Sequence, residues 1–234
     1  MAVRRLSPRV WSVGVLLPFP VHVWLVESEG GLTLVDGGLA GMGPGLVAAI
    51  RGLRLPLQRV VLTHGHFDHV GGLRAVLAAW PVPVLAHPEE LAFLRGERRY
   101  PRGQPAGRGA RPRVDPRLLR PLEDRPGGLE PRHCPGHTPG HTVYWDAADR
   151  LLLAGDLFSA YLPGRLGRPT PFLTTDMAQA VRSGAVVLDL QPERIAVCHG
   201  GVVRLPHLLY PAYRRRWLGP EPLRSGADPH TPPQ

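Results

Sequence analysis

Three histidines and one aspartate crowd into the stretch Thr63-His64-Gly65-His66-Phe67-Asp68-His69. Imidazole nitrogen and carboxylate oxygen are ligands that zinc, manganese and iron accept. A histidine-rich surface turn is the alternative, but four candidate ligands at this spacing favour a metal site. Because His64 and His66 are two residues apart, an extended turn would let both reach one ion. Asp68 and His69 are adjacent to each other and would face elsewhere, toward a second ion.

The elements around this cluster predict a turn between a strand and a helix. Arg59–Thr63 is a short apolar, β-branched run that is typical of a buried strand. Arg74–Trp80, which follows Gly71-Gly72, has the composition of a helix. Functional sites of layered α/β proteins gather at the carboxyl ends of strands, so the cluster lies where a site is expected.

Three more predicted strands end at a candidate ligand. These ligands are His137 in the turn Cys134–His141, Asp156 after Leu151–Gly155, and His199 after Ile195–Cys198. An apolar strand that leads into a carboxylate, as it does at Asp156, is costly unless the charge is paired or coordinated. Proline and glycine around His137 predict a tight turn that brings the backbone close to an ion.

Taken in this order, the segments resemble the metallo-β-lactamase superfamily, in the branch that includes glyoxalase II and related lactonases. The resemblance extends from about Val10 to Val203. It implies one metal ion held by His64, His66 and His137, a second held by Asp68, His69 and His199, and Asp156 as the bridge between them.

The resemblance also implies a fold and a reaction. The expected fold is α/β (α+β), a four-layer αββα sandwich with two mixed β-sheets and the metals at one edge. The expected enzyme is a dinuclear metallohydrolase in which a hydroxide bridging two divalent ions attacks a thioester, a lactone or a related ester. Zinc is the favoured metal, with manganese or iron as alternatives, and Asp68 would pass a proton to the leaving group.

Two other activities of the same fold stay open at this point. A persulfide-dioxygenase-like oxidoreductase would hold a single iron at His64, His137 and Asp156. A nuclease would be consistent with the net charge of +9, which arginine alone carries because the chain has no lysine. The arginines are spread out and do not alternate with aromatic residues, so a nucleic-acid partner is disfavoured.

Other residues near these motifs are weaker candidates. Asp36 follows the predicted strand Leu32–Val35 and matches a family position that supports the ligands, while His22 and Tyr161 could contact substrate. A structural role is predicted for His141, and His87 is expected to cap or pack. Cys134 and Cys198 are interpreted as small buried residues beside the site, with a ligand, a redox switch or a disulfide as alternatives.

The chain as a whole has 234 residues and 43% hydrophobic content, enough for a sizeable core. We expect one domain over residues 1–218, a loop or lid rich in arginine, proline and glycine at 96–128, and a flexible tail at 219–234. No run is long enough to cross a membrane, and no signal peptide is apparent. The protein is therefore predicted to be cytoplasmic, to act on a small molecule, and to be a monomer or homodimer.

Composition and periodicity also predict the remaining elements. The predicted strands are Val10–Leu17, Val21–Glu27, Val82–Ala86, Leu129–Cys134, Thr142–Trp145, Arg150–Ala154 and Arg194–Cys198. The predicted helices are Leu46–Leu53, one that begins at Pro88–Leu94, and Thr175–Leu190.

Overall fold

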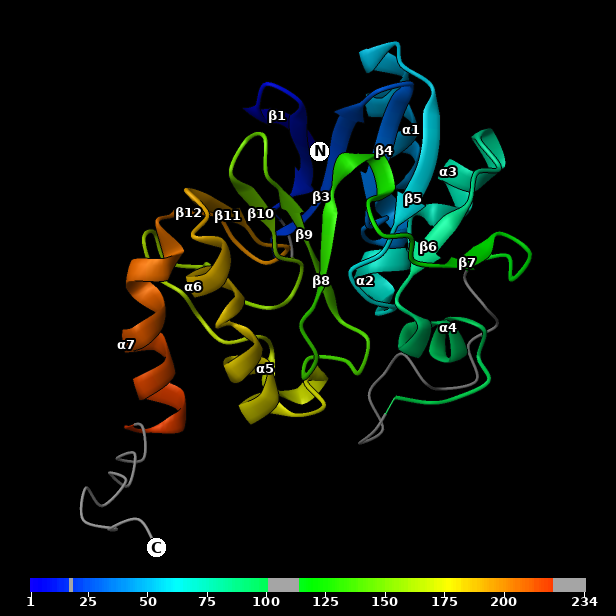
Figure 1. The fold of residues 1–234 in the computed structure, drawn as a ribbon. Helices are drawn as coiled ribbons and strands as arrows, with labels where there is room; N and C mark the ends of the chain where they lie inside the picture. The colour runs from blue at the N-terminus through cyan, green and yellow to red at the C-terminus, as the bar shows by residue number, and fades with distance from the viewer. Residues whose placement is uncertain (17–18, 101–113, 221–234) are drawn as a thin grey trace, which may run out of the picture.

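Two β-sheets packed face to face form the centre of the computed structural model, which describes residues 1–16, 19–100 and 114–220 (Figure 1). The first sheet has the spatial order β1 (Ala2–Ser7), β2 (Val10–Val15), β3 (Val21–Ser28), β4 (Gly31–Val35), β5 (Leu57–Val61), β6 (Val84–Ala86) and β7 (Leu119–Pro121). The second has the order β12 (Val202–Arg204), β11 (Arg194–Ala196), β10 (Leu151–Leu153), β9 (Thr142–Asp146) and β8 (Glu130–His133).

Both sheets are mixed. In the first, neighbours from β1 to β4 are antiparallel and those from β4 to β7 are parallel. In the second, β10 and β11 are parallel and the other pairs are antiparallel. The parallel pairs matter for function, because the carboxyl ends of their strands lie at the same edge of each sheet.

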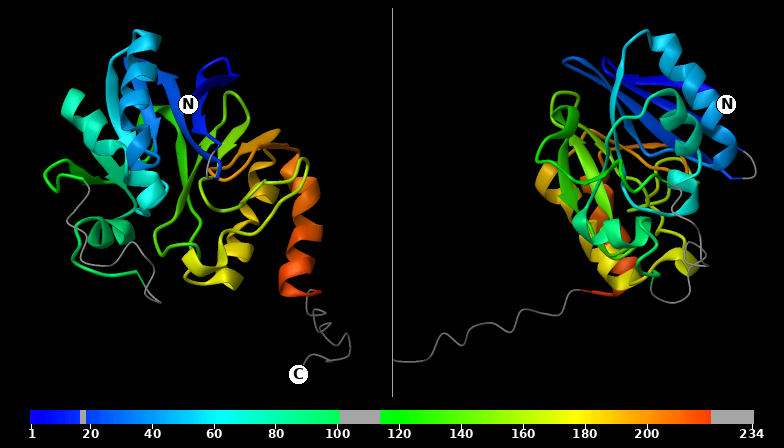
Figure 2. Two further views of the ribbon diagram at one scale, coloured as in Figure 1. Left: turned by 180° about the vertical axis from the view of Figure 1, so that it is seen from behind. Right: turned by 90° about the vertical axis from the view of Figure 1, so that its right-hand side faces the viewer.

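Helices cover the outer faces of the two sheets (Figure 2). Against the first sheet lie α1 (Gly43–Leu53) and α3 (Leu73–Ala79), and against the second lie α5 (Met177–Ser183), α6 (Val186–Leu190) and α7 (Pro206–Leu218). Two shorter helices, α2 (Phe67–Val70) and α4 (Pro88–Leu94), follow β5 and β6. The short 3₁₀ helices are Ala40–Met42, Pro126–Gly128 and Pro171–Leu173. The predicted αββα layering is confirmed.

Alternation along β10 shows why two cores form. Leu151 and Leu153 belong to the apolar cluster shared by the two sheets, whereas Leu152 belongs to the cluster between the second sheet and its helices. Successive strand residues point to opposite faces, so a strand covered on both sides must be apolar throughout. All three leucines are fully buried, and burying each side chain contributes about 1.5–3 kcal/mol.

The longest predicted helix, Thr175–Leu190, is two helices in the structure, so the prediction of one helix is wrong. Residues Thr175–Leu190 form α5 and α6, and the break falls at Gly184. A Cβ at Gly184 would lie 2.7 Å from the Tyr210 ring of α7 and 2.8 Å from Phe158. Glycine therefore lets α7 pack closely, and the tertiary contact outweighs the helical pattern of the segment.

Several other elements differ from the prediction. Strand β2 ends at Val15, earlier than the predicted Leu17, and residues 17–18 lie outside the described part of the chain. Strands β1, β7 and β12 and helix α7 were not predicted. Of the predicted lid at 96–128, residues 101–113 lie outside the described residues, and the described part contains β7 and the 3₁₀ helix Pro126–Gly128. The predicted tail at 219–234 lies outside the described residues from 221 onward.

Candidate metal centre

Three buried imidazoles meet at one point between the two halves of the chain. His64 Nε2 lies 2.9 Å from His66 Nδ1, and His137 Nε2 lies 3.2 Å from the former and 3.1 Å from the latter. All three side chains are at most 1% exposed. The structure thus brings together the three histidines that the sequence assigned to one ion, although His137 is 73 positions from His64.

A second group of donors lies beside the first. His199 Nε2 is 3.2 Å from Asp68 Oδ2 and 3.2 Å from Asp156 Oδ2, and His69 Nε2 is 3.3 Å from Asp156 Oδ1. The same Asp156 carboxylate lies 3.4 Å from His137 of the first group. All seven predicted ligands are therefore adjacent, with Asp156 between the two groups.

Two glycines allow the ligand loops to approach this closely. Gly136, which precedes His137, has a φ of 126°, and a Cβ there would lie 2.1 Å from the backbone nitrogen of Ala180. Gly155, which precedes Asp156, has a φ of 50°, and a Cβ there would lie 2.8 Å from the Thr63 side chain. Glycine tolerates both the left-handed backbone and the short contact, so each ligand follows a residue without a side chain.

The ring nitrogens that face away from the centre are held by hydrogen bonds. His69 Nδ1 donates to Asp36 Oδ2 at 2.8 Å, His137 Nδ1 lies 3.0 Å from the Thr174 hydroxyl, and His199 Nδ1 donates to the Pro20 carbonyl at 2.9 Å. Such bonds fix the ring orientation and place the lone pair of Nε2 toward the centre.

Asp36 combines this role with control of the β5 loop. Its carboxylate accepts from the Thr63 backbone N–H and the Thr63 hydroxyl, both at 2.8 Å, as well as from His69. Asp36 is fully buried and has a φ of 62°. A strained backbone at a fully bonded carboxylate is consistent with the predicted supporting role.

A buried glutamate ties the two ligand loops together. Glu90 in α4 accepts hydrogen bonds from the backbone N–H of Gly65 at 3.1 Å and of Gly140 at 2.9 Å, and from the Tyr100 hydroxyl. Burial raises the pKa of Glu90, and the hydrogen bonds partly offset that effect. The Tyr100 ring also packs edge-on against His66 at 5.1 Å.

The electrostatics of the first group favour neutral imidazoles at His64 and His137. Burial lowers the pKa of His64 and His137 well below the usual histidine range. Both rings therefore stay neutral near pH 7, the form in which imidazole can bind a metal. Burial likewise lowers the pKa of the neighbouring His141 to about 3, and its Nε2 accepts a hydrogen bond from the Asp156 backbone at 3.1 Å.

The second group favours positive charge. Burial alone would raise the pKa of Asp156, but the His199 and His69 imidazoles outweigh it and hold that pKa well below the usual range. Burial opposes the charged form of His199, yet the Asp156 carboxylate raises its pKa above the ordinary value. A buried carboxylate that stays ionised needs a compensating cation, which a metal ion supplies.

Unsatisfied atoms test whether a metal fits here. Asp68 Oδ1 is buried and makes no hydrogen bond within the described residues, and His69 Nε2 and Asp156 Oδ1, which lie 3.3 Å from each other, make no further one. Buried polar atoms are normally satisfied. Because the three atoms lie at the centre and are of the types that bind divalent cations, the residues present fit a metal site.

The two weaker candidates lie at the edge of the centre. His22 Nδ1 lies 3.1 Å from the Ser12 hydroxyl, and its backbone N–H donates to the Cys198 carbonyl at 3.1 Å. Tyr161 is 56% exposed. Burial raises the pKa of its hydroxyl despite the nearby His199 imidazole. Within the described residues neither side chain forms a hydrogen bond to a predicted ligand, so their roles in substrate binding stay predictions.

The cysteines do not form a disulfide, since both are free and buried. Cys198 lies with His69, Asp156 and His199 in a group whose ligand atoms are all within 4.8 Å of one another. Cys134 is outside that group, and burial raises its pKa to about 12. The disulfide alternative is therefore wrong.

Several side chains that support the ligands were missed from the sequence. They are Thr63, Glu90, Tyr100 and Thr174. Thr63 adjoins the histidine cluster, so its position offered a signal. The pair Glu89-Glu90 gave none, because only the fold shows that Glu90 is buried while Glu89 is exposed.

Histidines elsewhere have local roles. The His87 side chain caps α4 by accepting from the Glu89 backbone N–H at 3.3 Å, which confirms the predicted cap. Its ring stacks on His133, whose Nε2 donates to the Pro139 carbonyl.

Among the described residues, no helix has the length and apolar character needed to span a bilayer.

The chain is similar in sequence and in fold to known proteins over most of its length. Over 224 residues the chain is 32% identical to the probable metallo-hydrolase YybB of Bacillus subtilis, which covers 93% of this chain and 99% of that protein. It superimposes on TTHA1623, solved in a di-iron-bound form, with a TM-score of 0.66 and 30% identity over 84% of this chain and 95% of that one.

A shorter similarity, 42% identity over 60 residues, links the chain to a hydroxyacylglutathione hydrolase of Aeromonas salmonicida and covers 26% of this chain and 22% of that protein. The model of the metallo-beta-lactamase superfamily matches residues 16–199, from the β2–β3 hairpin to the last predicted ligand. The chain therefore belongs to the metallo-β-lactamase superfamily.

Proposed function

We propose that this protein is a dinuclear metal-dependent hydrolase of a thioester, a lactone or a related ester. The observation that carries the proposal is the pair of adjacent donor groups that share Asp156, whose Oδ2 lies 3.4 Å from His137 Nε2 in the first group and 3.2 Å from His199 Nε2 in the second. Two divalent ions held there would polarise a carbonyl and make hydroxide available near neutral pH.

The donor residues and Asp36 would hold the metal ions in position. His64, His66 and His137 offer ring nitrogens that already converge, at 2.9–3.2 Å from one another. Asp36 holds His69 in the tautomer whose Nε2 faces Asp156. Because these donors are already in place, little reorganisation is needed when substrate binds.

Asp68 is the proposed proton carrier. One of its oxygens faces His199 at 3.2 Å, and the other is buried without a hydrogen bond. As a carboxylate beside the centre, Asp68 would accept a proton from the water that supplies the hydroxide and deliver it to the leaving oxygen or sulfur, whose departure needs that proton.

The substrate class rests on weaker support. The partial similarity to a hydroxyacylglutathione hydrolase favours a thioester or ester over the strained amide of a β-lactam. We propose this branch, with zinc as the favoured metal. The name of TTHA1623 records a di-iron form, so iron belongs in the test.

A hydrolysis panel of acyl thioesters and lactones, run with enzyme of measured metal content, tests the proposal. We expect turnover that rises up to two ions per chain, and a loss of about 100-fold or more in kcat for Asp68→Asn. His66→Ala should abolish turnover, whereas His207→Ala, in the first turn of α7, should retain it. Undiminished turnover by His66→Ala would refute the site.

A measurement of oxygen consumption distinguishes the proposed hydrolase from the alternative dioxygenase. One iron per chain together with oxygen uptake on a persulfide substrate, and no ester hydrolysis, would replace the hydrolase with a dioxygenase. In that case Asp68→Asn and His199→Ala should leave the activity intact, because a single iron at His64, His137 and Asp156 does not need them.

A further inference from the structure

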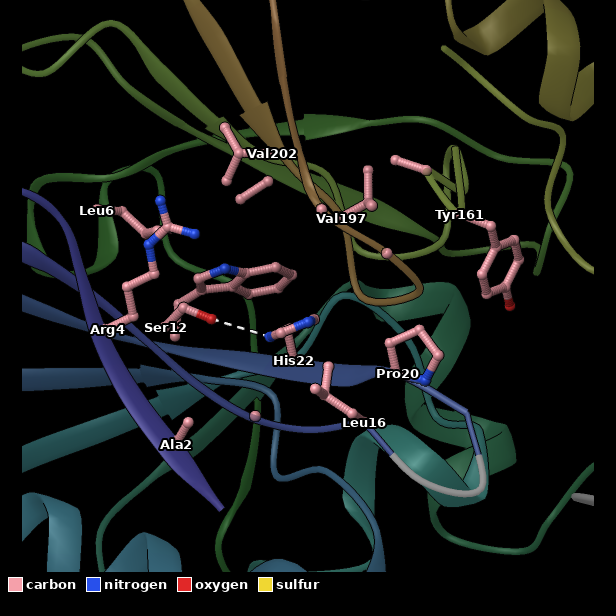
Figure 3. A pocket seen from close by; sticks show the side chains of 16 residues that line it. Ala2, Arg4, Leu6, Ser12, Leu16, Pro20, His22, Tyr161, Val197 and Val202 are labelled. Carbon is pink, nitrogen blue, oxygen red and sulfur yellow. Dashed lines mark hydrogen bonds between the residues drawn. The ribbon is translucent and has the colours of Figure 1, made fainter. Parts of the chain in front are cut away.

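A pocket of about 550 Å³ lies between the edge of the first sheet and the end of the second. On one side it is lined by β1, β2 and β3, and on the other by β11, the loop after it, and residues 160–161 (Figure 3). Its volume is within the range of small-molecule sites. No residue in the pocket is a predicted metal ligand, but His22 and Tyr161, the two weaker candidates for substrate contact, both line it.

The pocket adjoins the metal centre. Pro20 lines it, and the carbonyl of Pro20 accepts the His199 Nδ1 hydrogen bond. Ala160 and Gly200 also line it, and the Ala160 N–H donates to the His199 carbonyl at 2.9 Å. Residues of the pocket wall therefore bond directly to His199, so the pocket borders the metal centre at that predicted ligand.

The walls of the pocket are mainly apolar. Trp24 is fully buried, and Leu6, Val197 and Val202 add aliphatic surface. Gly14 leaves room for the His22 ring, since a Cβ at Gly14 would lie 2.3 Å from His22 Nδ1. Such walls suit an aliphatic chain rather than a sugar or a nucleotide base.

One charged side chain lies in the pocket. Arg4 and Tyr161 lie on opposite sides of the view, with His22 between them (Figure 3). Arg4 is the only residue with a formal charge among the sixteen that line the space. Arg4 is exposed, and no ion pair or hydrogen bond is found for it within the described residues, so its guanidinium is open to a ligand.

We propose that the pocket binds the acyl arm of the substrate, an aliphatic chain that ends in a carboxylate, with Arg4 as the group that recognises the carboxylate. This inference rests on the proposed hydrolase for the reaction, but the binding site stands on its own geometry. A single guanidinium matches a single negative charge and binds carboxylates in a bidentate way. The substrate is then the monoester or monothioester of a dicarboxylic acid, or a lactone that carries a carboxylate on its chain.

Matched substrates test the proposal in the metal-loaded enzyme. Hexanoyl and adipoyl thioesters of one thiol have acyl chains of equal carbon number, and the adipoyl chain adds the terminal carboxylate. We expect the wild-type kcat/KM to favour the adipoyl substrate, and Arg4→Gln to reduce that ratio about tenfold or more, mainly through KM.

Arg5→Gln is the matched control. Arg5 is the next residue in the same strand, lies over the Trp11 ring at 5.4 Å, and lines a different surface. It should keep the wild-type ratio. A wild-type ratio near one, or a preference that survives in Arg4→Gln, would overturn the proposal.

Binding separates a failure of this proposal from a failure of the hydrolase. Calorimetric titration of the metal-loaded protein with adipate and with hexanoate compares two carboxylates with one. Tighter adipate binding that is lost in Arg4→Gln supports the pocket even if no ester is hydrolysed, and that result would count against the hydrolase alone. Equal binding of the two acids, combined with ester hydrolysis, would count against the pocket alone.

Discussion

Burial of His141, next to the candidate metal centre, makes the stability of the folded protein depend on pH. In the folded protein its pKa is lowered to about 3, whereas the unfolded chain has the ordinary value of 6.5. Between these values the unfolded state binds one more proton, so stability is fully present above pH 6.5 and falls as the pH is lowered. The expected slope is about 1.4 kcal/mol per pH unit for this group.

This slope can be measured by urea unfolding of metal-free protein between pH 4 and 8. Wild type should lose stability more steeply toward acid than His141→Gln, whose amide can still accept from the Asp156 N–H but does not titrate. Parallel curves for the two proteins would show that His141 is not held neutral by the fold.

Asp36 belongs to the same scale, because one carboxylate holds both Thr63 and His69. Asp36→Ala should weaken metal binding about 10- to 100-fold, since the His69 ring loses the bond that orients it. Competition with a chromogenic chelator measures this affinity. Asp115→Asn, at an exposed surface turn, is the control, and an affinity of Asp36→Ala equal to that of the control would contradict the supporting role.

At the scale of elements, α4 joins loops that are far apart in the sequence. Glu90 bonds to Gly65 in the loop after β5 and to Gly140 in the loop after β8. The helix therefore fixes the distance between the loop that carries His64 and His66 and the loop that carries His137.

Glu90→Gln should lower the free energy of unfolding by about 1–3 kcal/mol, because an amide NH₂ would face backbone N–H groups that lose an acceptor. The adjacent Glu89→Gln, at an exposed position, should change it by less than about 0.5 kcal/mol. The urea midpoints of the two variants give the comparison. Equal midpoints would show that the hydrogen bonds of Glu90 to the two loops do not stabilise the fold.

At the scale of the whole molecule, the candidate metal centre joins the two sheets. Its predicted ligands follow β5, β8, β10 and β11, which belong to different sheets. A ligand that binds only the folded state stabilises it by RT ln(1 + [L]/Kd), about 2.7 kcal/mol at a hundredfold excess over Kd.

Chelation should therefore lower the melting temperature of the wild type, and added divalent metal should restore it. The His66→Ala variant should show a smaller shift, because the first donor group is incomplete. Scanning calorimetry with and without chelator measures both. A melting temperature that does not respond to chelator in metal-loaded wild type would contradict a structural coupling between the metals and the sheets.

The sequence alone determined the local features of this protein. Short-range patterns identified the strand before His64, the apolar runs that lead to Asp156 and His199, and the tight turn around His137, because each depends on neighbouring residues. The resemblance carried by these motifs gave the αββα fold. The limits of the single domain, the lid, the flexible tail and the cytoplasmic location all stay predictions.

Tertiary structure decided what depends on distant contacts. Polar and basic positions in β1, and Pro211 within α7, hid those elements, which form because they pack against β2 and the second sheet. Glu90 looks like Glu89 until α4 packs against the ligand loops. The convergence of His64 with His137, and the meeting of Arg4 with Val202 across one pocket, required both sheets, because packing of two surfaces is not encoded in any one segment.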